Sequence, residues 1–202
     1  MNAYIHSEIS VKNRGGKIED YLPIHDFIDS TKELCSDNRH RILHTIWGIR
    51  RVIVPIFGHY FHNSDGKIVN VKDLCEQDHI LPDYRYRFIP TLNDFVEAIS
   101  PDDSDLSLVS EVFEKYKSDK EVCELLLSPL NNTGRIESLL ITHNSWFLNE
   151  ILPKLFTKDL NIDKFKLSPS DFFNRMRFER WMDNGLDYPT SAKQFVLNNI
   201  NL

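Results

Sequence analysis

Glycine, cysteine and long apolar stretches are all scarce in this 202-residue chain. With only 7 glycines, an architecture of many strands joined by tight turns is not expected. The three cysteines, Cys35, Cys75 and Cys123, include no CxxC pair, so they indicate neither a disulfide framework nor a cysteine-rich zinc site. Unpaired cysteines are typical of a reducing compartment, and we expect a cytoplasmic protein.

The sequence also lacks the signatures of several common classes of function. The longest apolar stretch, 47–57, contains two arginines and a proline, so we expect no membrane span and no membrane partner. The first residues are too polar for a signal peptide. A net charge of -6 without a cationic arm makes nucleic acid an unlikely partner. No G-x-S-x-G motif, P-loop or dinucleotide fingerprint occurs.

The dominant pattern in the sequence is apolar residues at helical spacing. They predict a mainly α fold: a helical bundle with one small β-hairpin at about 59–70 and a C-terminal helical extension. The hairpin is indicated by Asp65-Gly66 between two alternating segments. A polar segment at 100–105 divides a histidine-rich helical domain, 1–100, from an all-helical region, 104–202, packed on it. We find no internal repeat. The predicted helices span 3–13, 18–35, 37–54, 71–80, 92–99, 105–117, 119–127, 134–156, 169–183 and 190–199.

Histidine is distributed very unevenly. Of eight histidines, all but His143 lie within the first 79 residues: His6, His25, His40, His44, His59, His62 and His79. His59 and His62 alternate on a predicted strand, a common surface pattern, and we leave them out of the site. The other histidines near the N-terminus are candidates for one shared site.

The spacing of these histidines places them on shared helix faces. His25 and Asp29 are four residues apart on one predicted helix, as are His40 and His44 on the next. Glu76-x-x-His79 follows on a third short helix, with Asp83 four residues further along. In helical bundles, such pairs direct ligands inward at one or two metal ions.

Imidazole with carboxylate suits zinc, iron, manganese or nickel. We therefore expect a divalent transition metal held by His25, Asp29, His40, His44 and His79. Glu76 or Asp83 would then be a general base for metal-activated water. Lys32 and Arg39 flank the same faces and would hold a phosphate group.

Three alternatives remain open. The same residues could form a metal-free acid–base or phosphate pocket. They could instead be a buried polar network that fixes how three helices meet. A Cys–His nucleophile involving Cys35 or Cys75 is a further option. In the C-terminal half, we interpret His143 and the arginine–aromatic stripe at 172–181 as parts of amphipathic helices.

The N-terminal half resembles a family of phage-borne and bacterial domains known only as a domain of unknown function. The resemblance covers residues 3 to about 99. It rests on EDYLPIHDFIDSTK at 19–32, NRHRILH at 38–44 and NSDGKIVNVKDLCEQDH at 63–79. It adds His6, which stands at a motif position, to the expected metal ligands. This chain departs from the family pattern at Asp78, because the family usually has a histidine directly after Glu-Gln.

A second, weaker similarity is to the HD-type metal-dependent phosphohydrolases, which carry histidines and aspartates on successive helices. The adjacent His-Asp pair occurs here only as His25-Asp26, out of their order. Together these features predict a metal-dependent hydrolase acting on a nucleotide or other phosphorylated small molecule. The alternative is a non-catalytic, phage-type protein that binds a host protein or a signalling nucleotide. For a phage-encoded chain, the compartment would be the host cytoplasm.

Overall fold

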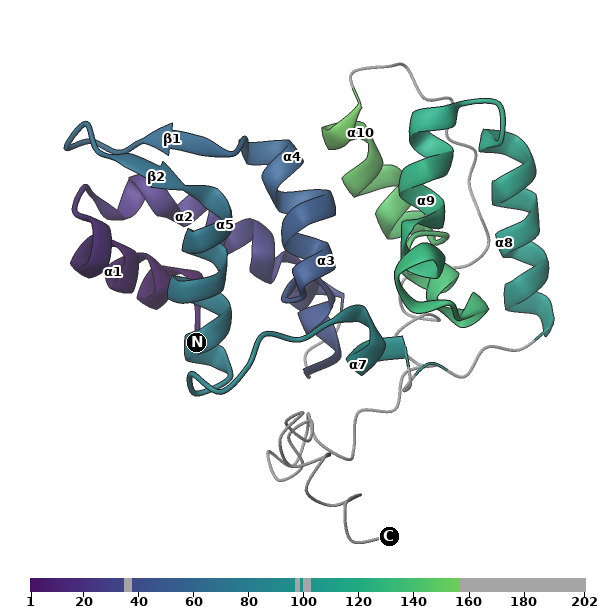
Figure 1. The fold of residues 1–202 in the computed structure, drawn as a ribbon, viewed down its shortest axis with the longest axis horizontal. Coiled ribbons are helices and arrows are strands. Elements are labelled where there is room, and N and C mark those ends of the chain that lie inside the picture. The colour runs from purple at the N-terminus through teal and green to yellow at the C-terminus, as the bar shows by residue number, and fades with distance from the viewer. Residues whose placement is uncertain (35–37, 97–98, 100–102, 157–202) are drawn as a thin grey trace, which may run out of the picture.

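The computed structural model describes residues 1–34, 38–96, 99 and 103–156. Within these residues the fold is mainly α with one two-stranded antiparallel ribbon, as the sequence predicts. Figure 1 shows α1, α2 and the ribbon at one end, α8 and α9 at the other, and the α3–α4 helix between them. The helices predicted at 169–183 and 190–199, and the stripe at 172–181, lie outside the described residues.

The chain begins with a helical hairpin. Asn2 caps α1 (Ala3–Arg14) by accepting from the Ile5 amide, and α1 ends at Gly15, whose φ of 80° disfavours any side chain. The second helix, α2 (Ile18–Asp29), packs along α1. It is shorter than the predicted 18–35, because a 3-10 turn, η1 (Ser30–Glu33), follows it.

The predicted helix 37–54 is broken in the middle. Residues Asn38–Leu43 form a 3-10 segment, η2, and a new helix starts after Thr45, whose hydroxyl accepts from the Gly48 amide at 3.0 Å. A Cβ at Gly48 would lie 2.5 Å from the Leu43 carbonyl oxygen, so only glycine allows the two segments to approach this closely. The break leaves His44 between the two segments, beside the core.

Three described helices contain a π turn just before a proline. The π turns η3 (Ile49–Ile53), η4 (Cys75–Ile80) and η6 (Phe147–Ile151) are followed by α4 (Val54–Phe57), α6 (Leu81–Asp83) and α10 (Leu152–Leu155). In each case proline is the second residue of the α segment. Because proline has no N–H and its ring crowds the carbonyl one turn earlier, a wider turn accommodates it.

The ribbon and the short helices complete the N-terminal half. Strands β1 (Tyr60–His62) and β2 (Ile68–Asn70) pair in antiparallel register, with Phe61 opposite Val69. This confirms the predicted hairpin. α5 (Val71–Leu74) then runs continuously through η4 into α6, so the predicted helix 71–80 extends to Asp83.

The described part of the C-terminal half shares a series of elements with the start of the chain: two helices, a 3-10 segment and a helix with a π turn before a proline. After α7 (Leu92–Val96) come two helices, α8 (Asp103–Tyr116) and α9 (Lys120–Thr133). A 3-10 segment, η5 (Ile136–Ile141), and a π-containing helix follow, so the predicted helix 134–156 is also broken. The break falls at His143-Asn144, where Asn144 accepts from the Phe147 amide. His-x-x-Trp thus occurs at both breaks, at 44–47 and 143–146.

One hydrophobic core joins the two halves. Tyr21, Ile42 and Ile53 belong to the same buried cluster as Leu126 and Phe147. A buried hydrogen bond also crosses the halves, from Trp47 Nε1 to Ser128 Oγ at 2.8 Å. No helix in the described part of the chain is both long and apolar enough to cross a bilayer.

Candidate metal centre

Five histidines and two aspartates converge inside the N-terminal half. They come from α1, from α2, from η2 and the residue after it, and from the helix 71–83. Water has almost no access to them, because none of the histidines is more than 6% exposed and the Asp83 side chain is 2% exposed. The set is His6, His25, Asp29, His40, His44, His79 and Asp83.

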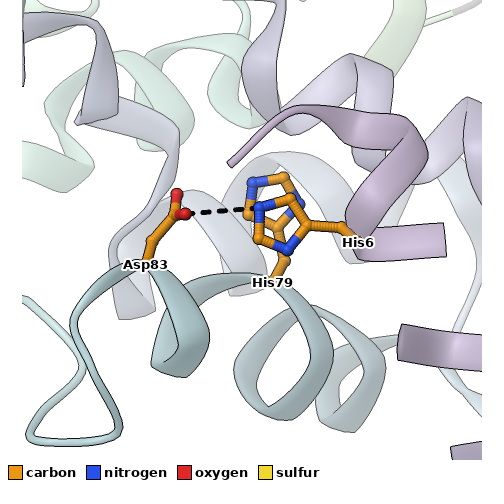
Figure 2. Close-up of side chains that lie close together, drawn as sticks. All are labelled: His6, His79 and Asp83. Carbon is orange, nitrogen blue, oxygen red and sulfur yellow. Dashed lines mark ion pairs between the residues drawn. The ribbon is translucent and has the colours of Figure 1, made fainter. Parts of the chain in front are cut away.

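The first group that could hold an ion consists of His6, His79 and Asp83. His6 and His79 stack with ring centroids 3.8 Å apart, and His6 Nε2 lies 3.3 Å from Asp83 Oδ1. Figure 2 shows the two stacked rings with the Asp83 carboxylate facing them. His79 and Asp83 come from the same helix, one turn apart, and α1 brings in His6.

The second group consists of Asp29, His40 and His44. Asp29 is the last residue of α2, and its Oδ1 lies 3.4 Å from His44 Nε2. The His40 ring meets the His44 ring edge to face, with centroids 5.6 Å apart. The break after η2 is what allows both histidines to reach Asp29.

The two groups share edges. His44 Nε2 lies 3.1 Å from His79 Nε2, and Asp29 Oδ1 lies 3.5 Å from His79 Nε2. With the 3.4 Å edge from His44 to Asp29, these three atoms form a nearly equilateral triangle. Metal–ligand bonds of about 2.0–2.1 Å in a tetrahedral site imply ligand–ligand edges of about 3.3 Å. These three atoms are therefore spaced like neighbouring metal ligands, and they join the two groups into one cluster.

Asp83 connects the groups through its two oxygens. Oδ1 faces His6, while Oδ2 lies 3.4 Å from His44 Nε2. The Met1 amino group also lies 2.7 Å from Oδ1. A carboxylate with one oxygen toward each group is suited to bridging two neighbouring cations.

Hydrogen bonds fix which nitrogen of His6 is available. Its Nδ1 lies 2.9 Å from the Asp78 carbonyl oxygen, which can only accept, so Nδ1 carries the proton. In the neutral ring, Nε2 then presents a lone pair toward Asp83 Oδ1. Two acceptors face each other at this point, and a proton or a metal cation between them would satisfy both. Metal-binding histidines characteristically donate their other N–H in this way.

His79 is held by a chain of two further residues. Its Nδ1 lies 2.9 Å from His25 Nδ1, and His25 Nε2 lies 2.9 Å from Ser10 Oγ. When His79 donates to His25, His25 donates to the serine oxygen and His79 Nε2 is left with a lone pair. The structure thus places His25, an expected ligand, behind His79 and outside both ion-holding groups.

Asp78 supports the site from outside. Its buried carboxylate accepts from Arg14 Nε at 2.5 Å and from Asn13 Nδ2 at 2.8 Å, while its carbonyl orients His6. His79 and Asp83 face the cluster, and the Asp78 carboxylate pairs with the end of α1.

Burial and hydrogen bonding set the charges of the site. Burial raises the pKa of Asp29 and Asp83, but the adjacent histidines outweigh it and hold both pKa values well below the usual range. Burial lowers the pKa of His25 to about 3 and that of His79 well below 6.5. These directions favour ionised Asp29 and Asp83 carboxylates and neutral His25 and His79 rings, and deprotonated ligands are the ones that bind metal ions.

Other expected residues lie apart from the cluster. The Glu76 carboxylate pairs with Lys72 Nζ at 3.0 Å and belongs to neither group. His59 and His62 are exposed on the ribbon, in keeping with their omission from the site. Burial raises the pKa of the Cys75 thiol, which disfavours it as a nucleophile. The side chain of Arg39, like Cys35, lies outside the described part of the structure.

Lys32 lies where the cluster meets the surface. Its Nζ is 2.6 Å from Asp29 Oδ2 and 3.0 Å from the Met1 carbonyl oxygen. Asp29 and Lys32 also line a cleft of about 970 Å³. Neither the cleft nor the supporting roles of Ser10 and Asp78 were predicted, because no local sequence signal marks contacts made across helices.

Comparison with known proteins identifies the family. Residues 1–104 match the family described as a domain of unknown function, DUF6915, and the chain belongs to that family. The match spans the histidine cluster and ends where α8 begins. No curated protein and no solved structure matches the chain.

Proposed function

We propose that this member of the family is a metal-dependent hydrolase acting on a phosphorylated small molecule. The observation that carries the proposal is the convergence of buried imidazole nitrogens and carboxylate oxygens on one place in the fold. His6 Nε2 faces Asp83 Oδ1 at 3.3 Å, and His44 Nε2 faces Asp29 Oδ1 at 3.4 Å. Carboxylate oxygens and imidazole nitrogens at such distances form a ligand set that suits a divalent cation.

His6, His79 and Asp83 would hold one ion, and Asp29, His40 and His44 a second beside it. When bound, such ions lower the pKa of water and polarise a phosphoryl oxygen. Zinc, iron, manganese and nickel all accept this set of nitrogen and oxygen donors. The similarity to HD-type phosphohydrolases supports the same chemistry, although the His-Asp order differs.

The remaining roles follow from position. Asp29 is the candidate ligand that lines the cleft, and with its Oδ2 beside Lys32 it would orient a metal-bound water toward a substrate rather than take the proton of that water. Lys32, ionically paired with that oxygen, is placed to hold a phosphate oxygen. Glu76 is not assigned a catalytic role, because its carboxylate pairs with Lys72 instead.

The test is metal content by mass spectrometry on protein purified without a histidine tag. We expect about one or two metal ions per chain, as in other bundle sites of this kind. The variant His40→Ala/His44→Ala should lose metal while remaining folded. The matched control is His59→Ala/His62→Ala, which removes two exposed histidines from the ribbon and should keep the native content.

The complete burial of the cluster also favours a second candidate. Buried, mutually bonded histidines can serve as a polar network that fixes helix packing in a non-catalytic binding protein. In that case the folded native protein would contain no stoichiometric metal, and the His40/His44 variant would lose stability alone. That result would overturn the hydrolase proposal and direct the work to partner pull-downs.

A further inference from the structure

The cleft beside the candidate metal centre is built from both halves of the chain. One wall is the end of α2 with η1, and α4 adds Ile56 and Phe57. The facing residues come from the helix 145–155 and include Trp146, Glu150 and Lys154. Its volume of about 970 Å³ lies within the range of small-molecule sites. The C-terminal half therefore contributes to a site that the family domain alone would leave incomplete.

The end of the cleft near the candidate metal centre is polar and suits an anionic group. Asp29 is the candidate ligand that lines it, and Lys32 pairs with Asp29 there. An anionic group entering at this end would meet the Lys32 ammonium and the cations held behind Asp29. A phosphate fits that combination of a point charge and metal ions.

The walls of the cleft also provide flat apolar surface. Phe27 and Phe57 meet edge to face with centroids 5.5 Å apart, and both are only partly buried. Trp146 also lines the cleft and is 7% exposed, so it offers a limited part of its ring beside the two phenylalanines. Aromatic walls of this kind accept a planar ring, such as a nucleobase, by stacking.

The rim limits how much negative charge the cleft accepts. Asp26, Glu33 and Glu150 are exposed around it, against the ammonium groups of Lys32 and Lys154. Carboxylates near a long anionic chain would repel it, so a triphosphate or a nucleic-acid backbone is disfavoured. The same carboxylates can accept hydrogen bonds from sugar hydroxyls and base amino groups.

We infer that this composite cleft binds a nucleoside monophosphate, with the phosphate at Asp29 and Lys32 and the base against Trp146. The inference rests on the proposed function, which it deepens by naming the substrate class. It assigns the C-terminal half the role of holding the base.

The first test compares three substrates on the metal-loaded full chain: nucleoside 5′-monophosphates, the corresponding triphosphates and glycerol phosphate. The monophosphates should have the highest kcat/KM. It should be about tenfold above that of glycerol phosphate, which has no base to stack, and it should also exceed that of the triphosphates, which the rim carboxylates repel. Equal values for all three would overturn the substrate inference alone. No hydrolysis of any of them by metal-loaded protein would overturn the proposed function, and this inference with it.

The second test uses paired tryptophans. Trp146→Leu should raise KM for nucleoside monophosphates about five- to tenfold, with metal content and glycerol phosphate hydrolysis unchanged. The control is Trp47→Leu, because Trp47 occupies the corresponding position in the first half and lies outside this cleft. An equal effect of both substitutions on KM would contradict the assignment of Trp146.

The third test remains informative if Trp146→Leu does not fold. Glu150→Arg reverses an exposed charge at the rim of the cleft. It should lower the ratio of kcat/KM for the monophosphate to kcat/KM for the triphosphate. Glu111→Arg makes the same change at an exposed position on α8 and should leave the preference as it was. An unchanged preference in Glu150→Arg would overturn the role of the rim.

Discussion

The Nδ1 atoms of His25 and His79 lie 2.9 Å apart in the buried core, so the two rings share one proton. His79 faces the candidate metal centre with its other nitrogen, while His25 continues to Ser10. The protonation of one ring therefore determines which nitrogen of the other is available. A metal ion held by His79 would therefore be influenced by His25 without contacting it.

This relationship predicts the effect of removing Ser10. Ser10→Ala deletes the hydrogen bond to His25 Nε2, and the loss of such supporting bonds usually weakens metal affinity about 10- to 100-fold. Competition with a chelator of known affinity measures it. Ser7→Ala is the matched control, because Ser7 is equally buried on α1 but bonds to the Ala3 carbonyl. Equal affinities of the two variants would argue against the Ser10–His25–His79 chain.

Metal binding should stabilise the fold. An ion that binds only the folded state adds about 2.7 kcal/mol at 100 times its Kd, which raises Tm by about 5–10 °C in a chain of this size. Differential scanning calorimetry with added zinc or manganese, and again after chelation, would show this shift. His79→Ala should abolish it. If neither added metal nor chelator changes the Tm, the cluster binds protons and no metal ion.

The burial of His143 predicts that the folded protein loses stability in mild acid. Burial lowers its pKa from 6.5 to about 4, and its Nδ1 bonds to the Leu139 carbonyl. Above pH 6.5 the ring is neutral in both states. As the pH falls toward 4, the unfolded chain takes up a proton that the folded chain excludes, so stability falls by on the order of 3 kcal/mol.

Urea unfolding at pH 7 and pH 4.5 measures this loss. His143→Gln removes the titrating ring. Between pH 7 and pH 4.5 this variant should therefore lose less stability than the native protein does. The lowered pKa values of His25 and His79 contribute with the same sign to both proteins and cancel in the comparison. The same pH dependence in both would show that His143 is not the source.

Gly48 predicts a strong effect of a single methyl group. Gly48→Ala places a Cβ 2.5 Å from the Leu43 carbonyl oxygen, so the two segments on either side of His44 must separate. Overpacking of this kind costs about 1–3 kcal/mol in unfolding free energy. Arg51→Ala, at an exposed position of the same helix, should change it by less than about 0.5 kcal/mol. Chemical denaturation compares them, and equal values would contradict the close approach.

The sequence by itself determined the mainly helical class and the ribbon at 59–70, from apolar periodicity and from Asp65-Gly66. Helical spacing proposed His40, His44 and His79 for one site, and the family resemblance added His6. The breaks at His44 and His143 were missed, because apolar periodicity continues across them. A Thr or Asn cap interrupts each helix without changing that pattern.

Only the tertiary structure decided the roles within the cluster. It placed His25 behind His79, turned Glu76 toward Lys72 and aligned Asp83 with both groups. It also brought Trp146 to the cleft beside Asp29, although the two are far apart in the chain. Spacing along one helix fixes which side chains share a face. The direction of that face, and the residues it meets, depend on how all the helices pack into one core.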